Sequence, residues 1–283
     1  MDKSGDSGTG RISPTAYATG YFWYKQGMSH PALATAQGRR LHYAFRPFIA
    51  GTRIFGGLSM DALLLARHRG IDGVLSRAIE EGRVGQVVEV AAGLSPRGWD
   101  FMRRYERRLT YLETDLPAMA TTKRQLLEGA DLLSARHRVV VLDVLAADGP
   151  RSLEAVMETL DPKVGTAIIT EGLMNYFAPE VAQDVWRRFA RALARFPQGI
   201  YLSDLYLNNR NNGAVVGAFG KLMQAFVRGR MHTHFNCEAQ ANQRLRDCGF
   251  SQVIVHQARG IPAVRDIAHI SGADRVSVLE ART

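Results

Sequence analysis

Apolar residues recur along the chain in two alternating patterns, short β-branched runs and longer stretches with helical spacing. The short runs predict strands, at residues 86–90, 108–115, 138–144, 165–172, 199–206, 251–257 and 275–281. Helical spacing predicts helices between and before them, at residues 56–81, 98–106, 117–134, 150–160, 179–196 and 237–248. Nearly continuous apolar strands separated by helices are typical of a mainly parallel sheet covered on both faces. The sequence therefore predicts a doubly wound α/β fold.

Two segments depart from this alternation. Residues 14–31, PTAYATGYFWYKQGMSHP, are rich in aromatic side chains. We interpret them as a lid over a bound ligand, and a helix packed on the sheet edge is the alternative. Residues 207–237 contain the loop signal NNRNNGAVVG and predict a helix and loop inserted before the last two strands.

The chain is expected to consist of a polar start and one domain. Residues 1–12 are polar, and we expect them to be disordered. Residues 13–283 are expected to form one ligand-binding domain, in which residues 13–55 make up the lid region.

The stretch VVEVAAGLSPRGW, residues 87–99, has the outline of a nucleotide-binding turn. A strand-like run leads into Ala91, Ala92 and Gly93, and polar residues then lead into a helix. Neither the three glycines of a dinucleotide fingerprint nor the Gly-Lys-Ser/Thr of a P-loop is present. The turn therefore has no sequence feature for holding a phosphate.

Acidic residues stand at the ends of most predicted strands. In an open parallel sheet, ligands bind beyond the carboxyl ends of the strands, and the polar residues there are Glu89, Glu113, Asp115, Asp143, Glu171, Ser203 and Asp204. Carboxylates would repel a pyrophosphate but would accept hydrogen bonds from ribose hydroxyls, an adenine amino group or an ammonium. S-adenosylmethionine (SAM) offers all three and carries no phosphate. The alternative is that these acids cap helices or pair with arginines.

Charge and cysteine content narrow the function classes. The net charge is +9, from 36 Lys and Arg against 27 Asp and Glu, but the basic residues are scattered over helix-like segments. We interpret them as solvated helix faces and expect no nucleic-acid partner. His232, His234 and Cys237 lack a fourth ligand at metal spacing, so we expect no metal. A polar start and no apolar run of membrane-spanning length predict a cytoplasmic protein without a membrane partner.

Several motifs occur in an order that resembles a known family. The stretches are VVEVAAGLSPRGW, YLETDLPAM, VLDV and ITEGLMNYF, with TAYATGYFWYKQGMSHP near the start. Together they resemble the leucine carboxyl methyltransferase superfamily, and within it the bacterial polyketide-synthesis-type O-methyltransferases. The resemblance runs from about residue 13 to the end. It implies a seven-stranded Rossmann-like methyltransferase sheet with SAM as co-substrate.

The resemblance also implies a role for particular residues in binding SAM. Arg67 matches the arginine that holds the methionine carboxylate, and Ala91 stands where many relatives have glycine. Asp115 matches the acid on the ribose hydroxyls, and Asp143 the acid near the adenine amino group. The expected SAM-binding residues are Arg67, Glu89, Ala91, Gly93, Asp115, Asp143, Val144 and Glu171.

The loop after the fourth strand is expected to face the sulfonium and the acceptor. Glu171 and Tyr176 match the Glu and Tyr of that loop in the family. The expected catalytic residues are Tyr176, Ser203, Asn175 and Glu171, and Tyr17, Tyr21 and Trp23 are expected to form the lid.

Methyl transfer from a sulfonium needs mainly alignment and exclusion of water. A carboxylate acceptor requires no general base, whereas a phenol or amine does, and the loop after the fourth strand contains neither histidine nor lysine. Methyl transfer to a small natural-product or metabolite acceptor is the first hypothesis. Cyclisation of SAM to azetidine-2-carboxylate with release of methylthioadenosine is the second. A non-catalytic SAM-binding protein is the third.

Overall fold

The computed structural model describes residues 14–208 and 232–283. The predicted disorder of residues 1–12 lies outside the described residues. So does most of the predicted insertion at residues 207–237, of which residues 209–231 are not described.

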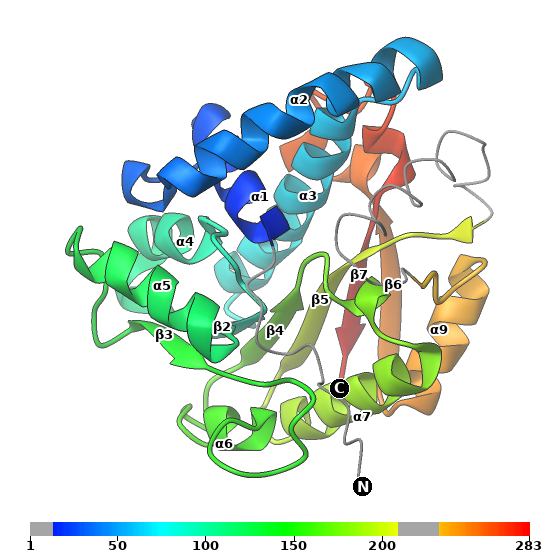
Figure 1. Ribbon diagram of the computed structural model, residues 1–283. Helices are drawn as coiled ribbons and strands as arrows, with labels where there is room; N and C mark the ends of the chain where they lie inside the picture. Colours follow the sequence, from blue (N-terminus) through cyan, green and yellow to red (C-terminus); the bar gives the residue numbers. More distant parts are fainter. Residues whose placement is uncertain (1–13, 209–231) are drawn as a thin grey trace, which may run out of the picture.

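A seven-stranded sheet forms the centre of the molecule, with strand order β3-β2-β1-β4-β5-β7-β6 (Figure 1). Strand β7 is antiparallel to both of its neighbours, and the pairings among β1 to β5 are parallel. The predicted mainly parallel α/β sheet is therefore confirmed. The strands are β1 Gln86–Val90, β2 Thr110–Asp115, β3 His137–Val141, β4 Thr166–Thr170, β5 Gly199–Leu205, β6 Gln252–Gln257 and β7 Ser277–Arg282.

Helices cover both faces of this sheet (Figure 1). Helices α3, α4 and α5 lie on one face, and α6, α7 and α9 lie on the other. Their bounds are α3 Met60–Glu80, α4 Arg97–Tyr105, α5 Pro117–Glu128, α6 Leu153–Met157, α7 Pro179–Leu193 and α9 Glu238–Asp247. Short 3-10 turns connect elements, at η1 Pro31–Leu33, η2 Glu106–Arg108, η3 Met174–Tyr176, η5 Ala258–Gly260, η6 Pro262–Val264 and η7 Ala273–Arg275.

Local sequence explains where several helices begin. Ser59 caps α3 by accepting a hydrogen bond from the Ala62 amide, at 3.2 Å, and Ser152 caps α6 in the same way. Pro179 is the first residue of α7, where its missing N–H costs no helical hydrogen bond.

The aromatic segment near the start is a helix, α1 Pro14–Lys25, followed by α2 Ala36–Gly56. Helix α1 is seated on the turn that follows β1, because a Cβ added at Gly20 would lie 2.7 Å from Leu94 Cβ. On the other side of that contact, a Cβ at Gly93 would lie 3.2 Å from Ala16 Cβ. The segment is thus a helix, as in the alternative, but it packs over the carboxyl end of the central strand β1 and not on the sheet edge, and the lid interpretation stays a prediction.

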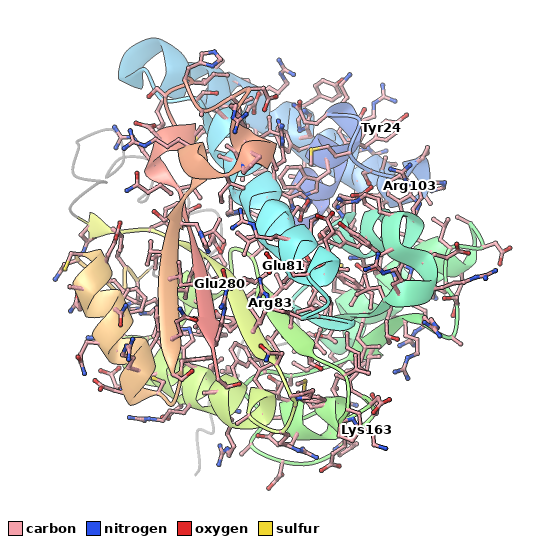
Figure 2. All side chains as sticks on the ribbon, turned by 180° about the vertical axis from the view of Figure 1, so that it is seen from behind. Tyr24, Glu81, Arg83, Arg103, Lys163 and Glu280 are labelled. Carbon is pink, nitrogen blue, oxygen red and sulfur yellow. The ribbon has the colours of Figure 1, made fainter. Side chains whose placement is uncertain are left out.

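Ion pairs join the end of α3 to the sheet beside it. Figure 2 shows Arg83 between Glu81 and Glu280, with N–O distances of 2.7 Å and 3.7 Å. Glu280 is buried in β7 and also contacts His256, at 2.7 Å. Arg103, by contrast, projects from the outside of α4 with its side chain 64% exposed.

Gly98 of α4 lies directly on a buried charged group. Glu113 is buried between His137, at 2.7 Å, and Lys123, and a Cβ added at Gly98 would lie 2.5 Å from its Cδ. Because both partners hold Glu113 in place, Gly98→Ala forces α4 away from the sheet. We expect a loss of about 1–3 kcal/mol in the free energy of unfolding, measured by urea denaturation.

Gly260→Ala is the matched control, because nothing lies within 4 Å of an added Cβ there. Its effect is expected to stay within about 0.5 kcal/mol. Equal stability of the two variants would contradict the close packing of α4 on Glu113.

Candidate functional site

The turn after β1 adopts the backbone of a glycine turn with few glycines. Ala91 and Gly93 have φ angles of +54° and +50°. For alanine this left-handed conformation costs about 1–2 kcal/mol, so surrounding contacts must hold it. Two of them come from β2: the Ala92 amide donates to the Thr114 carbonyl at 2.9 Å, and the Gly93 amide donates to Asp115 Oδ2 at 2.8 Å.

Two partly exposed carboxylates stand beside this turn, at the ends of β2 and β3. Asp115 accepts from the amides of Gly93 and Leu116, and burial raises its pKa although these two donors oppose the shift. Asp143 accepts from the Leu145 amide at 3.0 Å, while the neighbouring Val144 packs against the core. Because β2 and β3 are parallel neighbours, both carboxylates lie at one edge of the sheet and keep lone pairs for a ligand.

Arg67 of α3 reaches the ends of β4 and β5. Its Nε donates to Glu171 Oε1 at 2.9 Å, and its Nη1 lies 3.8 Å from Asp204 Oδ2. Asp204 in turn accepts from the Gly172 amide at 2.8 Å. Burial raises the pKa of Asp204, although Arg67 opposes the shift. The arginine side chain is 16% exposed, so part of it remains open to a ligand.

Behind Arg67 lies a group of buried charges that we call the Arg97 cluster: Arg97, Asp72, Glu89, Glu171 and His68. The Arg97 side chain is 0% exposed. Its Nε, Nη1 and Nη2 each lie 2.5 Å from a different carboxylate, those of Asp72, Glu89 and Glu171. His68 Nδ1 lies 2.8 Å from Glu171 Oε2.

The charged state of this cluster follows from its contacts. Burial alone would lower the pKa of Arg97, but the three carboxylates outweigh it and raise that pKa well above the ordinary value. Burial alone would raise the pKa of Glu171, but His68, Arg67 and Arg97 hold it well below the usual range. Arg97 and Glu171 are therefore both ionised at neutral pH.

Two residues expected in the site are placed elsewhere. Ser203 is 2% exposed and accepts from the Thr170 hydroxyl at 2.9 Å, on the α7 side of β5. The expectation that it faces the acceptor is therefore wrong, because strand alternation turns Asp204 to the site instead. Glu89 points toward α3 and α4, and its two oxygens accept from Arg97 and Tyr111. Its carboxylate belongs to the Arg97 cluster and is not open to SAM.

The loop after β4 places Asn175 and Tyr176 at the same end of the sheet as Arg67. Burial raises the pKa of Tyr176, and Arg67 partly opposes this. The segment 232–234 holds the loop: the His232 amide donates to the Asn175 carbonyl, and His234 Nε2 donates to the Met174 carbonyl, both at 2.8 Å. His234 is thus engaged with the backbone and not with a metal.

The expected lid residues belong to α1, and their side chains pack against neighbouring elements. Tyr17, Tyr21 and Trp23 are all buried. The Trp23 ring stacks on His68, with centroids 4.3 Å apart and an angle of 28°. Helix α1 therefore contacts both the turn after β1 and the Arg97 cluster, and whether it opens for ligands stays a prediction.

Sequence reasoning missed three members of this site, His68, Asp72 and Arg97, and it noted Asp204 at the end of the fifth strand without assigning it a role. His68 directly follows Arg67 on α3, and Asp72 lies about one helical turn further on. This spacing indicates that the His68 and Asp72 side chains lie on the same face of the helix. Arg97 follows the β1 turn but gives no sign in the sequence that it is buried. Asp204 lies next to Ser203, and only the direction of the strand's alternation separates them.

Within residues 14–208 and 232–283, no group of three or more His, Cys, Asp or Glu side chains is arranged to hold a metal ion. Among the helices of these two ranges, none combines the length and the apolar character that a membrane crossing requires.

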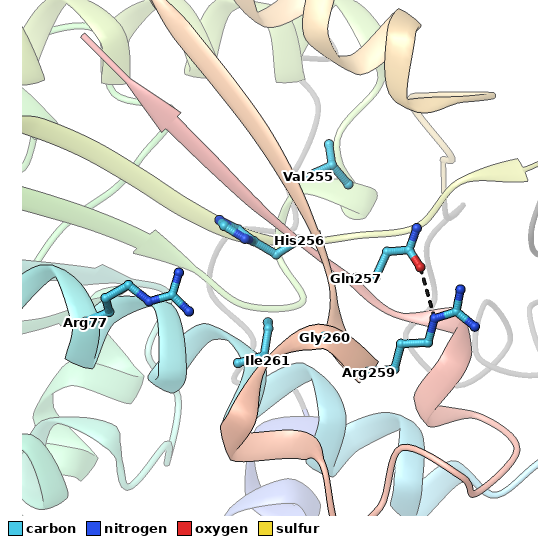
Figure 3. Close-up of a pocket in the computed structure, with 7 residues that line it drawn as sticks. All are labelled: Arg77, Val255, His256, Gln257, Arg259, Gly260 and Ile261. Carbon is cyan, nitrogen blue, oxygen red and sulfur yellow. Dashed lines mark hydrogen bonds between the residues drawn. The ribbon is translucent and has the colours of Figure 1, made fainter.

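A separate hollow of about 420 Å³ lies at the end of the edge strand β6 (Figure 3). It is lined by Arg77, Val255, His256, Gln257, Arg259, Gly260 and Ile261. Its two arginines are exposed, and Arg259 donates to Gln257 at 3.1 Å. The hollow lacks the buried charged groups that distinguish the ends of β1 to β5, so we place the candidate site at the latter.

Sequence comparison finds a family match. A sequence model of the family described as "Leucine carboxyl methyltransferase" matches residues 33–190, more than half of the chain. This range contains Arg67, Arg97, Asp115, Asp143 and Glu171.

Curated relatives cover part of the chain. A protein of Mycolicibacterium gilvum named "Putative S-adenosyl-L-methionine-dependent methyltransferase" is 35% identical over 121 residues, 43% of this chain and 38% of its own length. A similarly named protein of Mycobacterium leprae is 28% identical over 153 residues, 52% of this chain and 49% of its own. The chain thus matches less than half the length of these relatives.

Solved structures share the fold at low sequence identity. A DUF574 family protein from Streptomyces avermitilis is 15% identical with a TM-score of 0.60, covering 79% of this chain and 85% of that one. Human N-acetylserotonin methyltransferase in complex with SAM is 12% identical with a TM-score of 0.51, covering 75% of this chain and 51% of that one. At these identities the similarity shows the fold alone.

The Arg97 cluster predicts an acid-sensitive contribution to stability. Because the folded-state pKa of Glu171 lies below the unfolded value of about 4.3, its contribution is present above that pH and is lost as the pH falls through the folded-state pKa. Glu171→Gln leaves Arg67 and Arg97 short of a carboxylate. We expect it to lower the free energy of unfolding at pH 7 by about 3–5 kcal/mol.

Urea denaturation over a series of pH values measures this effect. The difference from the wild type should shrink as the pH falls below about 4. Glu128→Gln, at an exposed position of α5, is the control, with an expected effect within about 0.5 kcal/mol. A difference for Glu171→Gln that does not change with pH would argue against an ionised Glu171.

Proposed function

The chain belongs to the leucine carboxyl methyltransferase family, and from this premise we propose that it transfers the methyl group of SAM to a small-molecule acceptor. The observation that carries the proposal is the pair of open carboxylates, Asp115 and Asp143, beside a turn that has no phosphate-binding feature. The names of the relatives and the shared methyltransferase fold support it.

In this proposal different strands, all at the carboxyl end of the sheet, bind different parts of SAM. Asp115 accepts hydrogen bonds from the ribose hydroxyls, and Asp143 with Val144 receives the adenine. The backbone of Ala91 and Gly93 lies against the methionine part. Arg67, which is partly open beside Glu171, binds the methionine carboxylate.

SAM supplies an electrophilic methyl group on a sulfonium, and the protein has to align it with the acceptor and keep water out. We assign the acceptor side to the loop after β4, where the side chains of Asn175 and Tyr176 are only partly buried and form no hydrogen bond with another described residue. The acceptor that we propose is a small carboxylate or phenol of secondary metabolism. A carboxylate needs no general base, whereas a phenol would need one from outside this loop. Helix α1, with Tyr21 and Trp23, shields this end of the sheet.

Cyclisation of SAM to azetidine-2-carboxylate is the competing reaction. It needs several hydrogen-bond acceptors around the amino group, and Ser203, one of those expected, lies in the core on the other face of the sheet. This observation favours methyl transfer.

Incubation with SAM, with and without a panel of carboxylates and phenols, tests the proposed function. We expect S-adenosylhomocysteine to accumulate only when an acceptor is present. Methylthioadenosine and a cyclic amino acid formed from SAM alone would overturn methyl transfer in favour of cyclisation. Binding of SAM without any product across the panel would indicate a non-catalytic binder.

Asp115→Asn tests the assignment of the ribose site. The substitution removes a charged acceptor that also anchors Gly93, so we expect the Kd of S-adenosylhomocysteine to rise by about tenfold or more. Isothermal titration calorimetry measures it. Asp184→Asn on the outside of α7, whose side chain is 65% exposed, should leave the Kd unchanged. An unchanged Kd for Asp115→Asn would place the ribose elsewhere.

A further inference from the structure

We propose that Arg97 is a positioning residue: it holds Glu171 in the orientation that presents Arg67 to the methionine carboxylate. The proposal rests on the proposed function, because it assumes that Arg67 binds this carboxylate. Arg97 itself does not contact SAM in this proposal. Its effect is confined to the binding of the methionine part.

Three carboxylates hold the guanidinium of Arg97 in place. Its three nitrogens each donate to a carboxylate on a different element: Asp72 on α3, Glu89 on β1 and Glu171 after β4. A planar fork with several donors in fixed directions is needed for three partners, and lysine offers only a compact point charge. Arg97 is 0% exposed, so it acts on a ligand only through its neighbours.

Glu171 connects Arg97 to Arg67 because its two carboxylate oxygens have different partners. Oε2 accepts from Arg97, at 2.5 Å, and contacts His68, at 2.8 Å. Oε1 is left for Arg67 Nε, at 2.9 Å. The orientation of the Glu171 carboxylate therefore sets the direction of the Arg67 side chain, which is 16% exposed at the end of the sheet.

The remaining contacts of Arg67 include no second carboxylate at hydrogen-bond distance, and the Tyr206 hydroxyl supplies only an uncharged partner. The nearest other carboxylate oxygen is Asp204 Oδ2, 3.8 Å from Nη1. Asp204 is itself held by the Gly172 amide at 2.8 Å. If Arg97 no longer fixes Glu171, Arg67 can turn toward either acid and its guanidinium loses its fixed direction.

This arrangement predicts that loss of Arg97 affects only those ligands that carry the amino-acid part. S-adenosylhomocysteine has the carboxylate that Arg67 would bind, whereas methylthioadenosine has the same adenosine and thioether without it. Asp115 and Asp143 make no hydrogen bond or ion pair with members of the Arg97 cluster. The adenosine end should therefore be unaffected.

Calorimetric titration of both ligands into the full chain tests this prediction. For Arg97→Lys we expect the Kd of S-adenosylhomocysteine to rise by about tenfold or more and that of methylthioadenosine to stay within about twofold. Arg67→Lys should show the same selectivity. The double variant should bind S-adenosylhomocysteine no more weakly than Arg67→Lys within about twofold, because the two residues act in series.

Arg103→Lys is the matched control, an arginine of the same helix whose side chain is 64% exposed; it should change neither Kd. Asp72→Asn is a second test that does not depend on the folding of Arg97→Lys. It keeps the side-chain volume and removes one anchor of Arg97, and we expect a selective loss of roughly threefold or more for S-adenosylhomocysteine.

Several outcomes would overturn the proposal. Equal losses for both ligands in Arg97→Lys, or in Asp72→Asn if the first variant does not fold, would show a general structural role. Additive losses in the double variant would show that Arg97 does not act through Arg67. If the wild type binds neither ligand, the proposed function fails and this proposal fails with it. If the wild type binds both and Arg67→Lys is selective but Arg97→Lys and Asp72→Asn are not, only the role of Arg97 fails.

Discussion

The arrangement of the sheet's carboxyl end depends on one buried guanidinium. A charged side chain taken out of water is costly unless partners of opposite charge surround it. Arg97 meets this requirement with three carboxylates at 2.5 Å, drawn from α3, β1 and the residue after β4. One side chain of α4 therefore links two helices and two strands. The positions of Glu89 and Glu171 follow from this need for compensation.

This constraint divides the acids at the strand ends into two sets. Glu89, Glu113 and Glu171 face α3, α4 and α5, and each pairs with a buried base: Arg97, Lys123 or Arg67. Asp115 is the last residue of β2, and Asp143 lies two residues after β3. Both accept hydrogen bonds mainly from backbone amides. The first set holds helices to the sheet, and the second set is the one that we propose to contact SAM.

The sheet and the helices from α3 onward were readable from the sequence because each strand is a continuous apolar run and these helices have helical periodicity, whereas α2 was not predicted. The strands begin and end within about three residues of their predicted bounds. The site was readable only in part. An acid at a strand end is visible in the sequence, but whether it faces solvent or a buried arginine depends on which helix crosses that strand. Glu89 was misassigned for this reason, and Ser203 was preferred to Asp204 because the sequence does not show which face α3 covers.

The turn after β1 shows how packing can replace glycine. Ala91 holds a φ of +54°, and such strain persists only where surrounding structure determines the conformation. Here Asp115 and Thr114 fix the next two amides from one side. Helix α1 closes the other side, with Ala16 against Gly93 and Gly20 against Leu94. Because the same helix stacks Trp23 on His68, the segment that holds the turn in shape also rests on the Arg97 cluster. The two halves of the proposed SAM site are thus joined through α1 as well as through the sheet.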